Sequence, residues 1–139
     1  MIVFFNPLST TPGKQPLPLS LMSLAAVVDE HEPWCLVDGN LEADPAAAIV
    51  ARFAGCEGHR VILLAVSVMP GPQLSQAVPV CRRIRELLPH VRIVWGGYFP
   101  TQHTTTVLAA SYVDFVIRSQ GELSLVQLIE VLRSGGLFG

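Results

Sequence analysis

The sequence predicts an α/β protein with a doubly wound, five-stranded parallel sheet of the flavodoxin-like or Rossmann-like kind. Five short apolar runs alternate with segments of helical periodicity along the 139 residues, a length that fits one domain. The central run, residues 60–68, is apolar without alternation, which is typical of a parallel strand buried on both faces. Right-handed crossovers between such units favour the strand order 2-1-3-4-5.

The first half of the chain is expected to supply two strands and two helices. Apolar runs that stop at turn residues define the strands, which we place at 2–5 and 34–37. Apolar residues at helical spacing predict a helix over 17–28, after a loop rich in proline, serine and threonine. Asp44 is expected to cap a second helix over 45–54, because an aspartate followed by proline is a common helix start.

The second half repeats the pattern three times. Strands are expected at 60–68, 91–95 and 113–117, and helices at 74–88, 104–110 and 123–132. Pro79 falls in the early turns of the first of these helices, where a proline can bend it. A basic patch, Arg82, Arg83 and Arg85, is placed on the solvent side of the same helix. Residues 1–134 therefore form the domain, and the glycine-rich residues 135–139 are expected to begin a linker to a C-terminal domain absent from this chain.

The charge and composition of the chain indicate which classes of partner to expect. The net charge is −2 and no basic stripe is present, so we expect no nucleic-acid partner. No apolar run approaches the ~18–20 residues that cross a bilayer, so no membrane partner is expected. Three widely spaced cysteines, an odd number, favour reduced thiols in a cytoplasmic protein over a disulfide framework.

Small and polar residues gather where the predicted strands end. In a parallel sheet these ends share one edge, and ligands of open α/β sheets bind there. Glycines at such ends let a ligand approach the backbone, because they carry no Cβ. Each loop taken alone also fits ordinary turn chemistry. The candidate binding residues are Asn6, Pro7, Leu8, Ser67, Val68, Met69, Pro70, Gly96, Gly97, Tyr98, Thr101, Gly121 and Glu122; no catalytic residue or protein metal ligand is assigned.

Several motifs together carry a resemblance to a known family. They are residues 16–26, Ser67-Val68-Met69, Gly96-Gly97, residues 99–101, residues 113–118 and Gly121-Glu122. In this order and spacing the chain resembles the N-terminal cobalamin (B12)-binding domain of B12-dependent radical S-adenosylmethionine (radical SAM) enzymes over most of its length. The resemblance implies cobalamin as the cofactor of this domain. It also implies a partner, the protein's own C-terminal radical SAM domain, with a 4Fe-4S cluster, S-adenosylmethionine and methyl transfer or related radical chemistry.

One motif of the wider cobalamin-binding group is missing. Methionine-synthase-type domains carry D-x-H-x-x-G, S-x-L and a glycine pair. Here Ser67-Val68-Met69 stands in place of S-x-L and the glycine pair is present, but no histidine follows the first strand. The nearest string, Asp29-Glu30-His31, falls at a helix end and has Trp34 where the motif needs glycine. The resemblance therefore implies a corrinoid held without a histidine ligand, its lower face left to water or to apolar side chains of the first loop.

The resemblance also implies roles for the candidate residues. Ser67 would offer its hydroxyl to the nucleotide tail, while Gly96 and Gly97 would leave space for the ring of that tail. The corrin would lie near Asn6 to Leu8, Met69, Pro70 and Tyr98. Thr101 would meet the phosphate or cap a helix, and Glu122 would favour a helix N-terminus. The cysteines Cys35, Cys56 and Cys81 do not form the C-x-x-x-C-x-x-C of a radical SAM cluster.

Other functions fit the same fold class. The chain could have kept the fold, lost cobalamin, and become a docking module for another protein. A phosphoacceptor receiver domain needs acidic residues after the first strand and an aspartate ending the third, where Asn6 and Ser67 stand instead. A nucleotide or flavin binder or a hydrolase would be expected to show G-x-G-x-x-G, a P-loop or G-x-S-x-G, and none is present.

Overall fold

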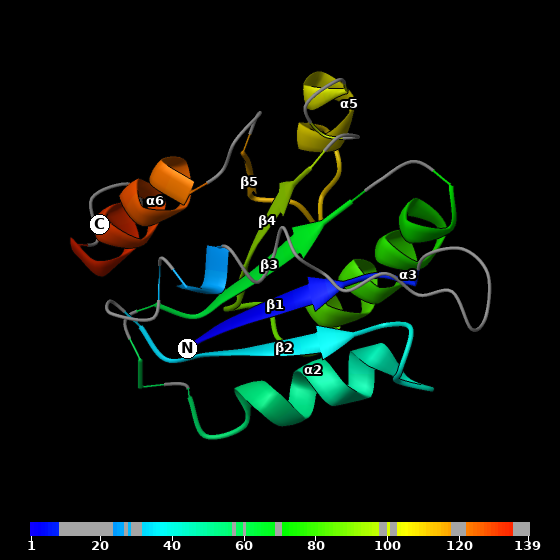
Figure 1. Cartoon of the computed structure of the whole chain (residues 1–139), viewed down its shortest axis with the longest axis horizontal. Helices are drawn as coiled ribbons and strands as arrows, with labels where there is room; N and C mark the ends of the chain where they lie inside the picture. The colour runs from blue at the N-terminus through cyan, green and yellow to red at the C-terminus, as the bar shows by residue number, and fades with distance from the viewer. Residues whose placement is uncertain are drawn as a thin grey trace.

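The computed structural model contains one five-stranded sheet with the strand order β2-β1-β3-β4-β5, so the predicted order is confirmed (Figure 1). All neighbouring strands run parallel. The structure describes residues 1–8, 24–26, 28, 32–56, 58–59, 61–68, 71–97, 100, 103–117 and 122–134. The strands are β1 (Ile2–Asn6), β2 (Trp34–Asp38), β3 (Leu63–Ser67), β4 (Arg92–Gly96) and β5 (Phe115–Val116).

The helices follow the predicted alternation with strands. They are α2 (Pro45–Phe53), α3 (Pro72–Leu87), α5 (Thr104–Leu108) and α6 (Glu122–Ser134). The cap at Asp44 is confirmed, because its side chain accepts a hydrogen bond from the Ala47 backbone N–H at 3.2 Å. Of the predicted helix over 17–28, residues 24–26 and 28 are described, and all are helical. None of the described helices combines the length and apolar character needed to cross a bilayer.

Helix α3 begins earlier than predicted and tolerates an internal proline. It starts at Pro72, directly after Gly71, and Pro79 lies inside it without ending it. A proline at the first helical position is favourable, because its missing N–H would have no helical partner there. The predicted solvent side of α3 was wrong for one residue. Arg82 and Arg83 are exposed, but Arg85 is half-buried and pairs with Asp114.

The sheet separates two apolar cores. Residues at alternate strand positions point to opposite faces, so each strand contributes to both. One face, here called the α3 face, packs against α2, α3 and α5, and its core includes Ile49, Ile84 and Val107. The other, the α6 face, packs against α6, through Leu125 and Ile129, and against the helical residues Ala25 and Val28. Figure 1 shows α6 on the side of the sheet away from α2.

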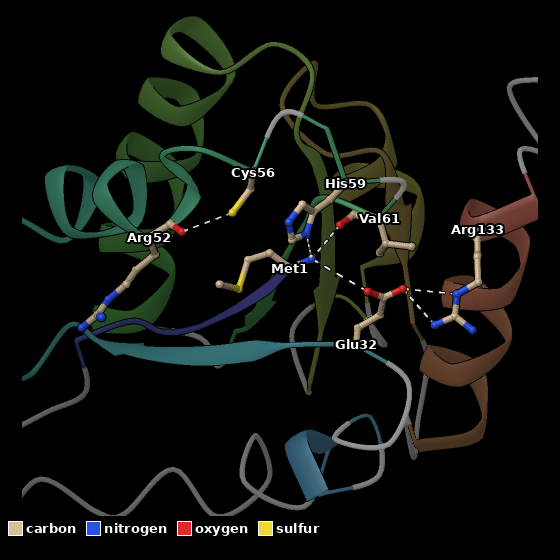
Figure 2. Close-up of polar contacts among 7 residues, drawn as sticks. All are labelled: Met1, Glu32, Arg52, Cys56, His59, Val61 and Arg133. Carbon is tan, nitrogen blue, oxygen red and sulfur yellow. Dashed lines mark hydrogen bonds and ion pairs between the residues drawn. The ribbon is translucent and has the colours of Figure 1, made fainter.

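A charged network closes the amino edge of the sheet (Figure 2). The Met1 ammonium donates to the Val61 carbonyl at 2.8 Å and lies 4.0 Å from a Glu32 carboxylate oxygen. Arg133 of α6 binds the same carboxylate at 2.8 Å. Partial burial lowers the pKa of the Met1 amine, and Glu32 opposes this shift. These contacts join the start of β1, the segment before β2 and the last turn of α6.

Candidate functional site at the carboxyl edge of the sheet

The ends of β3 and β4 lie side by side at the carboxyl edge of the sheet. Ser67 is the register partner of Gly96, and the Val68 N–H donates to the Gly96 carbonyl at 2.8 Å. The expectation that these two strand ends are neighbours is therefore confirmed. Both Ser67 and Gly96 are half-buried although they stand on central strands. The end of β1 completes the same edge, because β1 pairs with β3 on its other side.

The two faces of the sheet differ in side-chain size at this edge. On the α3 face, Val66, Val68 and Trp95 are almost completely buried, and the Trp95 Nε1–H donates to the Cys81 Sγ of α3 at 3.4 Å. On the α6 face, Ala65 is followed two residues later by Ser67, which strand alternation places on the same side. Gly96 likewise follows Val94 of the α6-face core. At the ends of β3 and β4 the α6 face therefore carries the small residues Ser67 and Gly96, whereas the α3 face carries Val66 and Trp95.

The adjacent positions 96 and 97 carry glycine for different structural reasons. Gly97 has φ +102°, and a Cβ added there would lie 3.1 Å from both the N and the O of Val68. Backbone packing therefore requires glycine at 97. At Gly96 an added Cβ would find the Ile117 carbonyl oxygen at 3.8 Å, an ordinary contact distance. Sterics thus do not require glycine at 96. Glycine at 96 leaves the backbone beside its register partner Ser67 without a side chain.

Amide side chains hold the loop after β1 against α3. The Gln73 Nε2 donates to the Asn6 Oδ1 at 3.1 Å and to the Pro7 carbonyl at 3.0 Å. The Leu8 N–H donates to the Gln76 Oε1 at 2.6 Å. Pro7 is buried, whereas Leu8 is 41% exposed. The described part of this loop therefore presents an apolar side chain outward while Gln73 and Gln76 bind its backbone.

The turn after β2 joins the same network. The Asn6 Nδ2 donates to the Asp38 Oδ1 at 3.2 Å, and the Asn40 Nδ2 donates to that oxygen at 2.9 Å. The Gly39 N–H donates to the Asn6 carbonyl at 2.7 Å. A Cβ at Gly39 would overlap the Gln76 Oε1 and lie 2.8 Å from the Leu8 N. The ends of β1 and β2 and the start of α3 therefore meet with no room for a further atom.

The sequence analysis missed Gln73 and Gln76, although a signal was present. The core side of α3 includes Ala77, Val80 and Ile84. Residues four positions apart on a helix share a face, so this stripe extends backward to positions 73 and 76. A polar residue at a core-facing position of a first helical turn indicates a buried hydrogen-bond partner across the edge of the sheet.

The structure places part of the predicted site. Six of the predicted residues lie at one edge, at or directly after the ends of three neighbouring strands: Asn6, Pro7, Leu8, Ser67, Gly96 and Gly97. Val68 lies there too, but its side chain belongs to the α3-face core. Glu122 is the first residue of α6, and its side chain is not described. The predicted contacts Met69, Pro70, Tyr98, Thr101 and Gly121 lie outside the described residues, as does His31.

Comparison with solved structures shows the fold. The RcsB response regulator of Salmonella typhimurium matches with a TM-score of 0.60 and 17% identity, over 100% of this chain and 62% of that chain. At this identity the likeness concerns the fold alone. Where a phosphoacceptor receiver domain needs acidic residues, the ends of β1 and β3 carry Asn6 and Ser67.

Comparison by sequence shows the family. The chain is 32% identical over 132 residues to the anaerobic magnesium-protoporphyrin IX monomethyl ester cyclase of Synechocystis, across 91% of this chain. The chain spans about a quarter of the length of that relative, as the match covers 25% of it. The profile of the B12 binding domain matches residues 7–129, which include strands β2 to β5 and begin directly after β1. The chain belongs to the B12-binding domain family.

Proposed function

We propose that this chain is the cobalamin-holding module of a B12-dependent radical SAM enzyme. Its membership of the B12-binding domain family supports cobalamin as the ligand. The observation that carries the proposal further is the pair of small residues, Ser67 and Gly96, side by side on the α6 face at the carboxyl edge. Ligands of open α/β sheets bind at this edge, and a planar group needs backbone that side chains do not cover.

In this proposal the nucleotide tail of cobalamin lies along the α6 face. Ser67 offers a hydroxyl that can donate to a nitrogen or an oxygen of the tail. Gly96 leaves space for the ring of the tail, and Gly97 keeps the β4 turn close to Val68. The α3 face cannot take the tail, because Trp95 and its neighbours fill it. Thr101, Gly121 and Glu122 are proposed to contact the tail or its phosphate.

The corrin ring is proposed to lie over the strand ends. Leu8, which is exposed, supplies an apolar surface from the loop after β1. Met69, Pro70 and Tyr98 are proposed to contact the ring from the other loops. When bound, cobalamin supplies a cobalt centre for transfer of a one-carbon group or for related radical chemistry. The residues of this chain bind and orient it, and we assign none of them as a cobalt ligand.

The catalytic chemistry is proposed to belong to another domain. A radical SAM domain, C-terminal to this one, would supply the 4Fe-4S cluster and S-adenosylmethionine. The Synechocystis relative supports this class of enzyme, and we take no substrate from it because the match covers 25% of its length. Cys35, Cys56 and Cys81 are free thiols, which supports a reducing compartment such as the cytoplasm.

Retention of hydroxocobalamin on gel filtration tests this function. The protein at micromolar concentration is mixed with excess hydroxocobalamin and separated from free cofactor. We expect stoichiometric visible absorbance to elute with the protein. The matched control is Ser67→Leu, which should fold but retain much less, because leucine occupies the space beside Gly96. Elution of all visible absorbance with free cofactor, for the unmodified protein, would contradict the proposal and favour a docking domain that has lost cobalamin.

A further inference from the structure

We propose that Gln73 and Gln76 of α3 are positioning residues, which set the loop after β1 as an apolar seat for the corrin ring. This inference rests on the proposed function and adds to it two residues outside the motifs that carry the family resemblance. Neither glutamine needs to touch the cofactor. Both act through Pro7 and Leu8, which they hold by hydrogen bonds.

The burial of Gln73 is the first step. Its exposed fraction is 8%, and that of Asn6 is 7%; among the described residues these two are the buried polar side chains. Gln73 also stands on the apolar stripe of α3, four residues before the buried Ala77. An amide at such a position is unfavourable unless it is hydrogen-bonded. Gln73 meets this condition by binding Asn6 and Pro7, so its bonds define where the end of β1 lies against α3.

The direction of the loop's polar groups is the second step. The Pro7 carbonyl accepts from Gln73, the Leu8 N–H donates to Gln76, and the Asn6 carbonyl accepts from Gly39. All three backbone groups point inward. Leu8 itself is 41% exposed, so its apolar side chain is the group left facing outward. The described part of the loop therefore offers a hydrophobic surface, which suits the face of a macrocycle.

The tight junction at Gly39 is the third step. A Cβ there would overlap the Gln76 Oε1 and crowd the Leu8 N at 2.8 Å. Interiors packed this closely transmit displacements from one segment to the next. A shift of either glutamine would therefore move Leu8, and the apolar seat would no longer have its place relative to Ser67 and Gly96.

Binding of two corrinoids tests the inference. Hydroxocobalamin carries the nucleotide tail, whereas cobinamide has the corrin ring without it. We expect Gln73→Leu and Gln76→Ala each to weaken the binding of both ligands by roughly tenfold. The first variant loses the bonds to Asn6 and Pro7 and the second loses the bond to Leu8, and these bonds hold the seat of the ring and not that of the tail. Arg83→Ala, an exposed change on the same helix, should leave both affinities unchanged. Val91→Ala, a buried change at the opposite edge, controls for general loss of stability.

Amide exchange gives a readout that needs no cofactor. The Leu8 N–H donates to Gln76 at 2.6 Å, so its hydrogen exchange should be slow in the unmodified protein and faster in Gln76→Ala. In Val91→Ala, the protection of the Leu8 amide relative to the amides of β1 should be the same as in the unmodified protein. This distinguishes a displaced loop from a protein that is merely less stable.

The outcomes separate the two proposals. If the unmodified protein binds both corrinoids and the glutamine variants bind them within about twofold of it, positioning by α3 is wrong and the proposed function stands. If the glutamine variants weaken hydroxocobalamin alone, the loop does not seat the ring and the inference is also overturned. If the unmodified protein binds neither corrinoid, the proposed function fails, and the inference fails with it.

Discussion

The two faces of the sheet are built from the same strands yet end differently at the carboxyl edge. On the α3 face, Val66, Val68 and Trp95 form a filled core against α3. On the α6 face, the same two strands end in Ser67 and Gly96, both half-buried. Strand β3 belongs to a run that looks uniformly apolar in the sequence. At its carboxyl end it nevertheless has a closed side, the α3 face, and an open side, the α6 face. The difference teaches that a binding surface for a large cofactor can be made by residue size on one face alone.

Substitutions on the closed side, the α3 face, should lower the free energy of unfolding the most. Trp95→Ala would leave a large cavity under α3 and remove the hydrogen bond to Cys81. We expect a loss of about 3–5 kcal/mol in the free energy of unfolding, measured by urea denaturation. A loss below about 1 kcal/mol would show that the α3 face is less closely packed than the structure indicates.

The neighbouring glycines should respond in opposite ways to the same change. Gly97→Ala places a Cβ 3.1 Å from the Val68 backbone at a positive φ, so we expect a loss of about 1–3 kcal/mol in unfolding free energy. Gly96→Ala places its Cβ 3.8 Å from the Ile117 oxygen, and we expect a change within about 0.5 kcal/mol. Thermal and urea unfolding of both variants measure this, and equal losses would contradict the distinction between the two positions.

The buried thiol of the closed face should give stability a dependence on alkaline pH. Burial raises the pKa of Cys81 from 9.0 to about 12. Above pH 9 the unfolded chain loses this proton while the native protein keeps it, so stability falls as pH rises from 9 towards 12. We expect a slope of up to about 1.4 kcal/mol per pH unit from this group. Urea unfolding of Cys81→Ala should lack that part of the slope; identical slopes in both proteins would refute it.

A substitution on the open side, the α6 face, should change stability the least and should weaken cobalamin binding. Ser67→Ala removes one hydroxyl from a half-buried position, so the fold should be unaffected. Loss of one hydrogen bond to the tail should cost about 0.5–1.5 kcal/mol in hydroxocobalamin affinity, measured by absorbance titration. Unchanged affinity would remove Ser67 from the proposed contacts and leave Gly96 as the remaining feature of this face.

The sequence was sufficient for the fold because local signals and topology rules agree. The five apolar runs, the Asp44 cap and the preference for right-handed crossovers led to the observed strand order. The same reasoning located the candidate edge, since every parallel strand ends there. Element boundaries differ from the predictions by a few residues, as at the start of α3.

Contacts between segments that lie far apart in the chain could not be predicted from the sequence. The pairing of Arg85 with Asp114 joins α3 to the residue before β5, and no local pattern indicates it. The bonds from Gln73 to Asn6 and Pro7 span β1 and α3 in the same way. The difference between the two faces of the sheet could not be predicted from the sequence either. Strand alternation shows which residues share a side, but the side itself is known only when one residue of each strand has been assigned to a face.

The comparison of hydroxocobalamin with cobinamide in Ser67→Leu tests the central claim most directly. If the tail lies on the α6 face beside Gly96, this variant should lose most of its affinity for hydroxocobalamin, down to the level of cobinamide. Its affinity for cobinamide, which has no tail, should stay as in the unmodified protein. Equal weakening of both corrinoids, or of neither, would show that the tail does not occupy this surface.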